Sequence, residues 1–229
     1  MPPRDLPRQR RGTTPQMVGR YPDYDVLEQA DHWDAVTREK VLARVHDVPP
    51  VRFFSAGEAA TVGALCDLLT AQHDEPRIPV LNFIDEKLHA GGGDGYQYAD
   101  MPDDTEAWRV VARGLDEEAA RRAGAASFAA AGDDVRRAIV EDLAKSRVEG
   151  GVWEAVNVQR LFSLVMRYVV EAFYSHPWAW NEIGFGGPAY PRGYSRFGSP
   201  HLNAAEREAW EGREAYDEDP VSHRREPPP

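Results

Sequence analysis

The sequence predicts an all-α protein: a single domain of about five or six helices, with a long C-terminal helix followed by an irregular segment rich in aromatic residues, glycine and proline. Apolar residues recur at spacings of three and four in several stretches, and these stretches begin at capping residues and end at glycine or proline. No run of alternating β-branched residues bounded by hairpin signals interrupts them. With 229 residues, 42% of them hydrophobic, the chain can bury one sizeable core.

Three helices are expected in the first half of the chain. Asp31 is suited to cap the first helix, which ends before the prolines of DVPP at residues 47–50. Ser55 and Glu58 form a capping box at the start of the second helix, and Pro79 suits the start of the third. The apolar faces of these helices are Trp33, Val36, Val41 and Val45; Val62, Leu65, Cys66 and Leu69; and Leu81, Ile84 and Leu88.

Further helices are expected in the second half. They open at Thr105, at Asp133 or Asp134, and at Val152, which follows the pair Gly150-Gly151. The last of them is the longest and runs to about residue 174. Their apolar faces are Trp108, Val111, Leu115 and Ala119; Val135, Ile139 and Leu143; and Trp153, Val156, Leu161, Leu164, Tyr168 and Phe173.

The two ends of the chain differ from its middle in composition. Residues 1–20 are rich in proline, arginine and threonine without periodicity, which predicts a disordered N-terminal tail. The helical domain is expected over residues 31–200. Residues 201–229, which end in DEDPVSHRREPPP, are expected to add a short helix and a disordered C-terminal tail.

Charge and hydropathy exclude two classes of partner. The net charge is −11, from 38 acidic and 27 basic side chains, and phosphate binding needs a basic surface, so nucleic-acid binding is not expected. No stretch reaches the ~18 apolar residues that a membrane span requires.

Arg10 and Arg11 form a pair, but no apolar region follows them, so a twin-arginine signal is not expected. The sequence predicts a cytoplasmic protein, which reaches the periplasm only if a partner carries it.

The motifs of several enzyme classes are absent from the sequence. There is no dinucleotide fingerprint in a strand–turn–helix setting, no P-loop, no G-x-S-x-G and no H-E-x-x-H. Cys66 is the only cysteine, so no thiolate metal cluster can form, and we expect its thiol to be buried and inert. Asp85 and Glu86 are adjacent and would point about 100° apart on a helix, so they do not form a carboxylate pair. We therefore predict no catalytic, cofactor-binding or metal-binding residue in this chain.

An aromatic segment, FYSHPWAWNEIGFGGPAYPRGYSRFG at residues 173–198, contains eight aromatic residues, five glycines and three prolines. It can seal the protein's own core, or it can recognise a partner, since Trp, Tyr and Arg are enriched at interface hot spots. Structural roles are expected for Phe173, His176, Pro177, Trp178, Trp180, Gly184, Gly186 and Gly187, with His176 as a cap or packing residue. Partner contacts are expected for Phe185, Tyr190, Arg192, Tyr194, Arg196 and Phe197.

Three stretches carry a resemblance to a known family. They are NFIDEKL at 82–88, NVQRLFSLVMRYVVEAFYSHP at 157–177, and WNEIGFGGPAYPRGY at 180–194. Together they resemble the gluconate 2-dehydrogenase subunit 3 family, over roughly residues 54–197. The end of the long helix and the Ile-Gly-Phe-Gly-Gly-Pro that follows are the most specific part.

The resemblance implies a non-catalytic accessory subunit. Members of the family are small helical proteins that help a large flavin-dependent sugar or polyol dehydrogenase, of the glucose-methanol-choline type, to mature and stay soluble. The resemblance places FAD in that partner and no cofactor in this chain, and a cytochrome c subunit often takes the electrons. Many members carry a twin-arginine signal and export the folded partner, whereas here the apolar region of such a signal is missing.

Two other functions remain open at this point. One is a free-standing sugar-binding protein that uses the rings of residues 173–197 as stacking platforms in a pocket. The other is an enzyme with Glu171, His176 and Glu182 as a local acid–base or metal-binding set.

Overall fold

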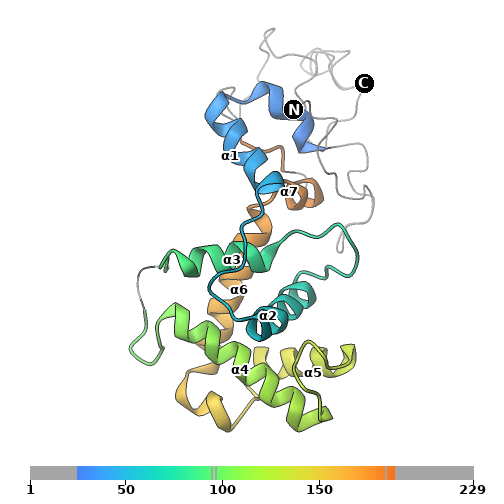
Figure 1. Ribbon diagram of the computed structural model, residues 1–229. Coiled ribbons are helices and arrows are strands. Elements are labelled where there is room, and N and C mark those ends of the chain that lie inside the picture. The colour runs from blue at the N-terminus through green and yellow to red at the C-terminus, as the bar shows by residue number, and fades with distance from the viewer. Residues whose placement is uncertain (1–24, 94, 96, 184, 189–229) are drawn as a thin grey trace, which may run out of the picture. The chain divides into compact units, whose positions relative to one another are not determined.

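The prediction of an all-α fold is confirmed for the residues that the structure describes, and they contain more helices than the five or six expected. The computed structural model describes residues 25–93, 95, 97–183 and 185–188. Within these ranges it contains seven α-helices and two 3-10 helices, η2 and η3, and no strand (Figure 1). None of the helices in this part of the chain combines the length and the apolar character needed to cross a membrane. The predicted tails, 1–20 and 201–229, lie outside the described residues.

The chain packs as two compact units. Residues 48–173 form one of them, which we call the central unit. The other, which we call the terminal unit, combines, among the described residues, 25–47 with 174–183 and 185–188. The single domain over residues 31–200 therefore stays a prediction.

The terminal unit contains η2 (Val26–His32), α1 (Ala35–His46) and α7 (Pro177–Ile183). The predicted cap at Asp31 is wrong: Asp34 caps α1, because its Oδ1 accepts hydrogen bonds from the backbone N–H groups of Val36 at 3.0 Å and Thr37 at 3.2 Å. Asp31 lies within η2 instead. Three residues of the predicted apolar stripe, Trp33, Val41 and Val45, are buried, whereas Val36 in the first turn of α1 is 65% exposed.

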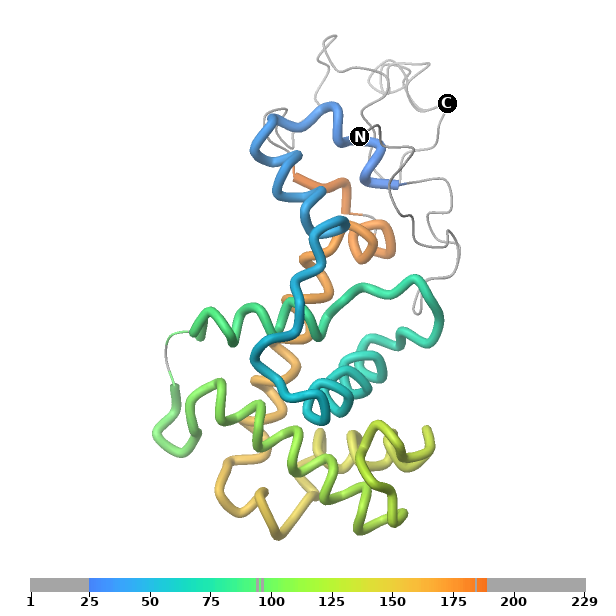
Figure 2. Tube along the Cα trace, in the orientation of Figure 1, coloured from blue at the N-terminus to red at the C-terminus, as the bar shows by residue number. Residues whose placement is uncertain are grey.

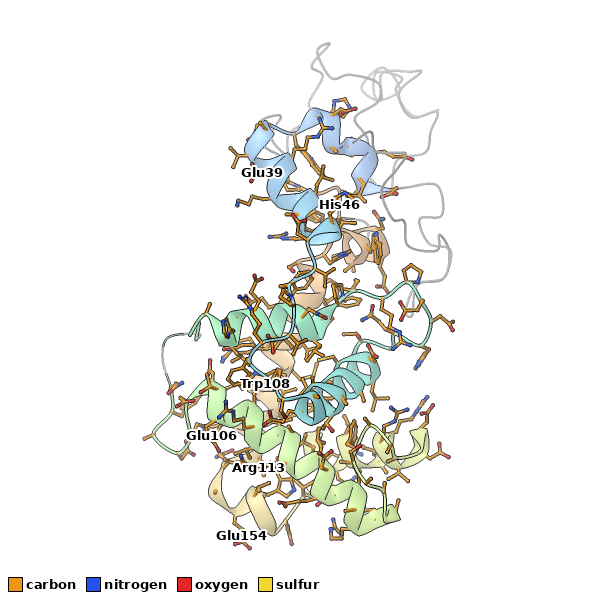
Figure 3. All side chains as sticks on the ribbon, viewed as in Figure 1. Glu39, His46, Glu106, Trp108, Arg113 and Glu154 are labelled. Carbon is orange, nitrogen blue, oxygen red and sulfur yellow. The ribbon has the colours of Figure 1, made fainter. Side chains whose placement is uncertain are left out.

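Five helices of the central unit have the following bounds: α2 (Ala56–Leu69), α3 (Val80–His89), α4 (Asp104–Ala123), α5 (Asp133–Ala144) and η3 (Gly151–Ala155). The unit also includes α6 (Val158–Tyr174) up to Phe173. Helix α4 packs against α2, α5 and η3, and α2 also packs against α3 (Figure 2). The predicted face of α4 is fully buried, including Trp108, which is labelled in Figure 3.

Local capping explains where the helices of the central unit begin. The predicted capping box is present: the Ser55 N–H donates to Glu58 at 2.9 Å, and the Glu58 N–H donates to the Ser55 hydroxyl at 3.4 Å. Helix α4 begins one residue before the predicted Thr105, because Asp103 caps it.

The predicted long helix from Val152 is wrong in its first part. Gly150 and Gly151 both have positive φ, and η3 begins at Gly151 and ends before the extended residue Val156. Helix α6 then starts at Val158, where the Asn157 side chain accepts a hydrogen bond from a backbone N–H of the first turn at 3.1 Å. An asparagine cap thus sets the start of the helix.

Cys66 is buried in α2, and burial raises the pKa of its thiol well above the ordinary range. Since the thiolate is the reactive form, Cys66 is inert in the native protein.

Candidate functional site

Helix α7 interrupts the segment that the sequence predicts to be irregular. Pro177 is its first residue, a position where the fixed φ of proline suits a helix. His176 precedes it and acts as a cap: its Nδ1 accepts a hydrogen bond from the Trp178 N–H at 3.2 Å, and its carbonyl accepts one from the Ala179 N–H at 3.0 Å. The imidazole also hydrogen-bonds to the backbone of Arg44. Because the Trp178 N–H takes the Nδ1 lone pair, this nitrogen is not available to a metal ion or a substrate proton.

The environment of His176 keeps the imidazole neutral. The side chain is 1% exposed, and burial lowers its pKa from 6.5 to about 3, with the Arg44 cation acting in the same direction. The unfolded chain therefore binds a proton between about pH 6.5 and pH 3 that the folded protein excludes. The free energy of unfolding is therefore unaffected by this group above pH 6.5. Between pH 6.5 and about pH 3 it decreases by about 1.4 kcal/mol for each pH unit that the pH falls.

We expect the free energy of unfolding to fall by about 1.4 kcal/mol between pH 7.5 and pH 5.5 in the unmodified chain. This range lies above the ordinary pKa values of carboxylates, so they contribute little to the change. His176→Asn keeps a capping residue but removes the titrating ring, and it should flatten the dependence. Urea unfolding at the two pH values measures it. His46→Asn, at the exposed end of α1, is the control that should keep the slope; equal slopes in both variants would contradict the assignment.

The two tryptophans of α7 are buried, and so is Phe173 at the end of the central unit. The Trp180 indole N–H donates to the Tyr174 carbonyl at 2.6 Å. Arg44 of α1 donates to the Ser175 carbonyl at 2.7 Å and lies 5.9 Å from the centre of the Trp180 ring. Trp178 and Trp180 are each only 6% exposed, so neither is an open platform on which a sugar ring could stack.

Gly187 brings the chain after α7 back against η2. Its φ is +80°, a region that residues with a Cβ rarely adopt, and a Cβ here would lie 2.8 Å from Val26 and 3.1 Å from Trp33. Gly186 is buried as well. A second link is polar: the Val26 N–H donates to the Asn181 side chain at 2.7 Å, and that side chain donates to Asp25 at 3.2 Å. Only glycine at 187 allows this close approach.

Two apolar side chains remain open on this surface. Phe185 is 37% exposed and meets the Trp180 ring edge-on, with 5.4 Å between ring centres. Ile183 is 42% exposed. We call these two residues, the last residue of α7 and one that lies just beyond it, the α7 apolar face. The other predicted partner contacts lie outside the described residues, as does one predicted turn glycine; they are Tyr190, Arg192, Tyr194, Arg196, Phe197 and Gly184.

In the central unit the NFIDEKL stretch has a structural role that sequence analysis missed. Asp85 is fully buried, and its carboxylate accepts hydrogen bonds from the backbone N–H groups of Arg52 at 2.7 Å, Phe53 at 3.0 Å and Phe54 at 2.9 Å. The Asn82 side chain donates to the Pro49 carbonyl at 2.8 Å. The sequence carries a signal for this role, because Asp85 lies between Leu81 and Leu88 on the apolar side of the helix.

Glu171, a member of the alternative acid–base set, is engaged in an ion pair of its own. Glu171 forms an ion pair with Lys87 at 2.9 Å, and the Lys87 ammonium also lies 4.3 Å from the centre of the Tyr168 ring. Among the residues that the structure describes, no group of three His, Cys, Asp or Glu side chains could hold a metal ion. Glu182 is buried in α7.

A pocket of about 170 Å³ lies in the central unit, between residues 97–104 and α6. Inside it, the buried carboxylate of Asp104 accepts a hydrogen bond from the Tyr168 hydroxyl at 2.6 Å. No prediction from the sequence pointed to this pocket.

Comparison with known proteins gives one match. The model of the gluconate 2-dehydrogenase subunit 3 family matches residues 56–187, more than half of the chain. The matched range includes the NFIDEKL stretch, the long helix α6 and the chain up to Gly187. No curated protein and no solved structure matches the chain.

Proposed function

The chain belongs to the gluconate 2-dehydrogenase subunit 3 family, and from this premise we propose that it is a non-catalytic accessory subunit that binds and stabilises a flavin-dependent dehydrogenase. Membership suggests a small subunit of a gluconate 2-dehydrogenase complex, with dehydrogenase subunits as partners. The proposal adds that the large partner is of the glucose-methanol-choline type and acts on a sugar or polyol. The family match over residues 56–187 is the observation that carries it.

The chemistry of this chain fits an accessory role. His176 is engaged with backbone groups on α7, and Glu171 is paired with Lys87. Asp85, the most deeply buried acid of the family-like stretches, serves the backbone of residues 52–54. His176, Glu171 and Asp85 thus each have a structural task, and Glu182, the remaining member of the alternative acid–base set, lies buried in α7. In the proposal FAD belongs to the partner, this chain holds no cofactor, and the complex matures in the cytoplasm.

The α7 apolar face supplies a contact of the right kind. Phe185 is a rigid ring held against Trp180, and the position of the chain is fixed by the approach of Gly187 to Val26 and Trp33. A preorganised ring loses little conformational entropy when a partner covers it. We therefore place Phe185 at the interface with the dehydrogenase.

Phe185→Ala is expected to weaken the complex with the dehydrogenase subunit by about 10- to 30-fold, because a hot-spot aromatic contributes about 2 kcal/mol. The loss of stability of the isolated chain should be small, since the ring is already partly in water. The measurement is the Kd for a flavin-dependent dehydrogenase subunit of the glucose-methanol-choline type from the same organism, together with the melting temperature of the isolated variant.

Val36→Ala is the matched control. It truncates another exposed apolar side chain of the terminal unit, 65% exposed on α1, and should leave the Kd within about threefold of the original value. A Phe185→Ala variant that binds normally would remove Phe185 from the interface. An unmodified chain that does not bind the dehydrogenase at all would overturn the accessory role itself.

A further inference from the structure

The pocket of the central unit has the dimensions of one amino-acid side chain. Its volume of about 170 Å³ is well below the roughly 300–1,000 Å³ that small-molecule sites commonly occupy. The residues that the argument uses from its lining are Tyr98, Met101, Asp104, Arg160, Ser163 and Arg167. Tyrosine, methionine and arginine are enriched in protein interfaces. Size and composition together favour a protein partner that inserts one side chain.

The rim of the pocket is held in place before any partner arrives. Tyr98 is 51% exposed, and the guanidinium carbon of Arg160 lies 4.0 Å from the centre of its ring. Asp100 pairs with the same guanidinium and also accepts a hydrogen bond from the Asn157 side chain at 3.1 Å. The plane of Arg160 is therefore fixed by a ring on one side and a carboxylate at one edge. Preorganisation of this kind reduces the entropy lost on binding.

The unused hydrogen-bonding capacity of the pocket is on the donor side. Asp104 already accepts hydrogen bonds from the Tyr168 hydroxyl at 2.6 Å and from Gln97 at 3.4 Å. Asp100 is bound to Arg160 and Asn157. Arg160 carries five N–H donors, and the one ion pair to Asp100 involves only one of its nitrogens. The side chain of Arg167 also lies in the pocket lining. A planar guanidinium with donors to spare matches a carboxylate.

We propose that this pocket is a second docking point for the dehydrogenase subunit and that it receives a glutamate or aspartate side chain of that subunit. The inference rests on the proposed function and adds a named contact in a different unit from the α7 apolar face. The carboxylate bonds to Arg160, while the aliphatic part of the inserted side chain lies against Met101 and the Tyr98 ring.

Two variants test the proposal from opposite directions. Arg160→Gln removes the charge that receives the carboxylate, and Ser163→Phe fills the pocket from an exposed position of α6. Each should raise the Kd for the dehydrogenase subunit at least ~10-fold. The control is Arg113→Gln on α4. This arginine has an exposure similar to that of Arg160 and is paired with Glu106 at 2.7 Å (both are labelled in Figure 3), and neither residue is part of the pocket lining. It should leave the Kd unchanged, and melting temperatures confirm that all three variants fold.

The outcomes separate the two proposals. If the unmodified chain binds and both pocket variants bind equally well, the docking pocket is refuted and the accessory role stands. If only Ser163→Phe weakens binding, the surface is an interface but the acidic occupant is refuted. If the unmodified chain fails to bind the dehydrogenase, both proposals fall together.

Discussion

Replacing Asp85 with alanine is expected to lower the free energy of unfolding by about 3 to 5 kcal/mol. The carboxylate is fully buried and accepts hydrogen bonds from three consecutive backbone N–H groups, those of Arg52, Phe53 and Phe54. Alanine removes all of these bonds and leaves donors without a partner. Buried donors of this kind are costly because they have lost their water. Urea unfolding followed by circular dichroism measures the loss.

Two further variants make the result interpretable. Asp85→Asn keeps the size of the side chain but replaces one accepting oxygen with an N–H₂ donor, so it should lose about half as much stability. Glu86→Ala changes the neighbouring, exposed acid of α3 and should stay within about 0.5 kcal/mol of the original chain. An Asp85→Ala protein within 1 kcal/mol of the original would show that water replaces the carboxylate at residues 52–54.

Gly114→Ala is expected to destabilise the protein by about 2 kcal/mol, although alanine is the better helix former. A Cβ at this position of α4 would lie between 2.2 and 2.7 Å from three atoms of the Trp153 ring. Real Cβ atoms do not approach other atoms so closely, and Trp153 is a rigid, buried side chain that cannot turn away. Overpacking of a core commonly costs about 1 to 3 kcal/mol, and a clash with a rigid ring belongs at the upper end of this range. After the ~1 kcal/mol that helix propensity returns, about 2 kcal/mol of destabilisation remains.

The control variant for Gly114→Ala is expected to change the free energy of unfolding in the opposite direction. Gly63→Ala, inside α2, places a Cβ at an ordinary 3.5 Å from Leu81 and should stabilise the chain by about 0.5 to 1 kcal/mol. In a Trp153→Leu background, Gly114→Ala should lose most of its penalty, because the ring that it meets is gone. A Gly114→Ala protein that is more stable than the original, as Gly63→Ala should be, would mean that η3 shifts to make room.

Helix positions could be predicted from the sequence because apolar spacing depends on local order. The buried face of α4 and the capping box at Ser55 were found in this way. Helix starts were predicted less well where several capping residues stand close together. Asp31 and Asp34 are both good caps, and the folded chain uses Asp31 within η2 and Asp34 at α1. No local rule decides between them.

The candidate sites depended on contacts that join distant parts of the sequence. Asp85 is bonded to residues more than thirty positions earlier, and Arg160 pairs with Asp100. The spacing of apolar residues along the sequence does not show which distant residues pair. The hydrogen bonds of Asp85 to the backbone of residues 52–54 and the pocket of the central unit were therefore not predicted. The aromatic segment was predicted as irregular throughout because glycine and proline dominate its second half. Its first half forms α7, for which the His-Pro start was the available signal.

The buried thiol of Cys66 makes it possible to measure local opening of α2 in the unmodified protein. The chain has a single cysteine, and in the native protein it lies inside α2, protonated and shielded from reagents. A thiol reagent can therefore modify the protein only during moments when α2 leaves the core. The rate of modification measures how often that happens, without any added label. A partner that clamps the central unit would slow the reaction, and Asp85→Ala would speed it.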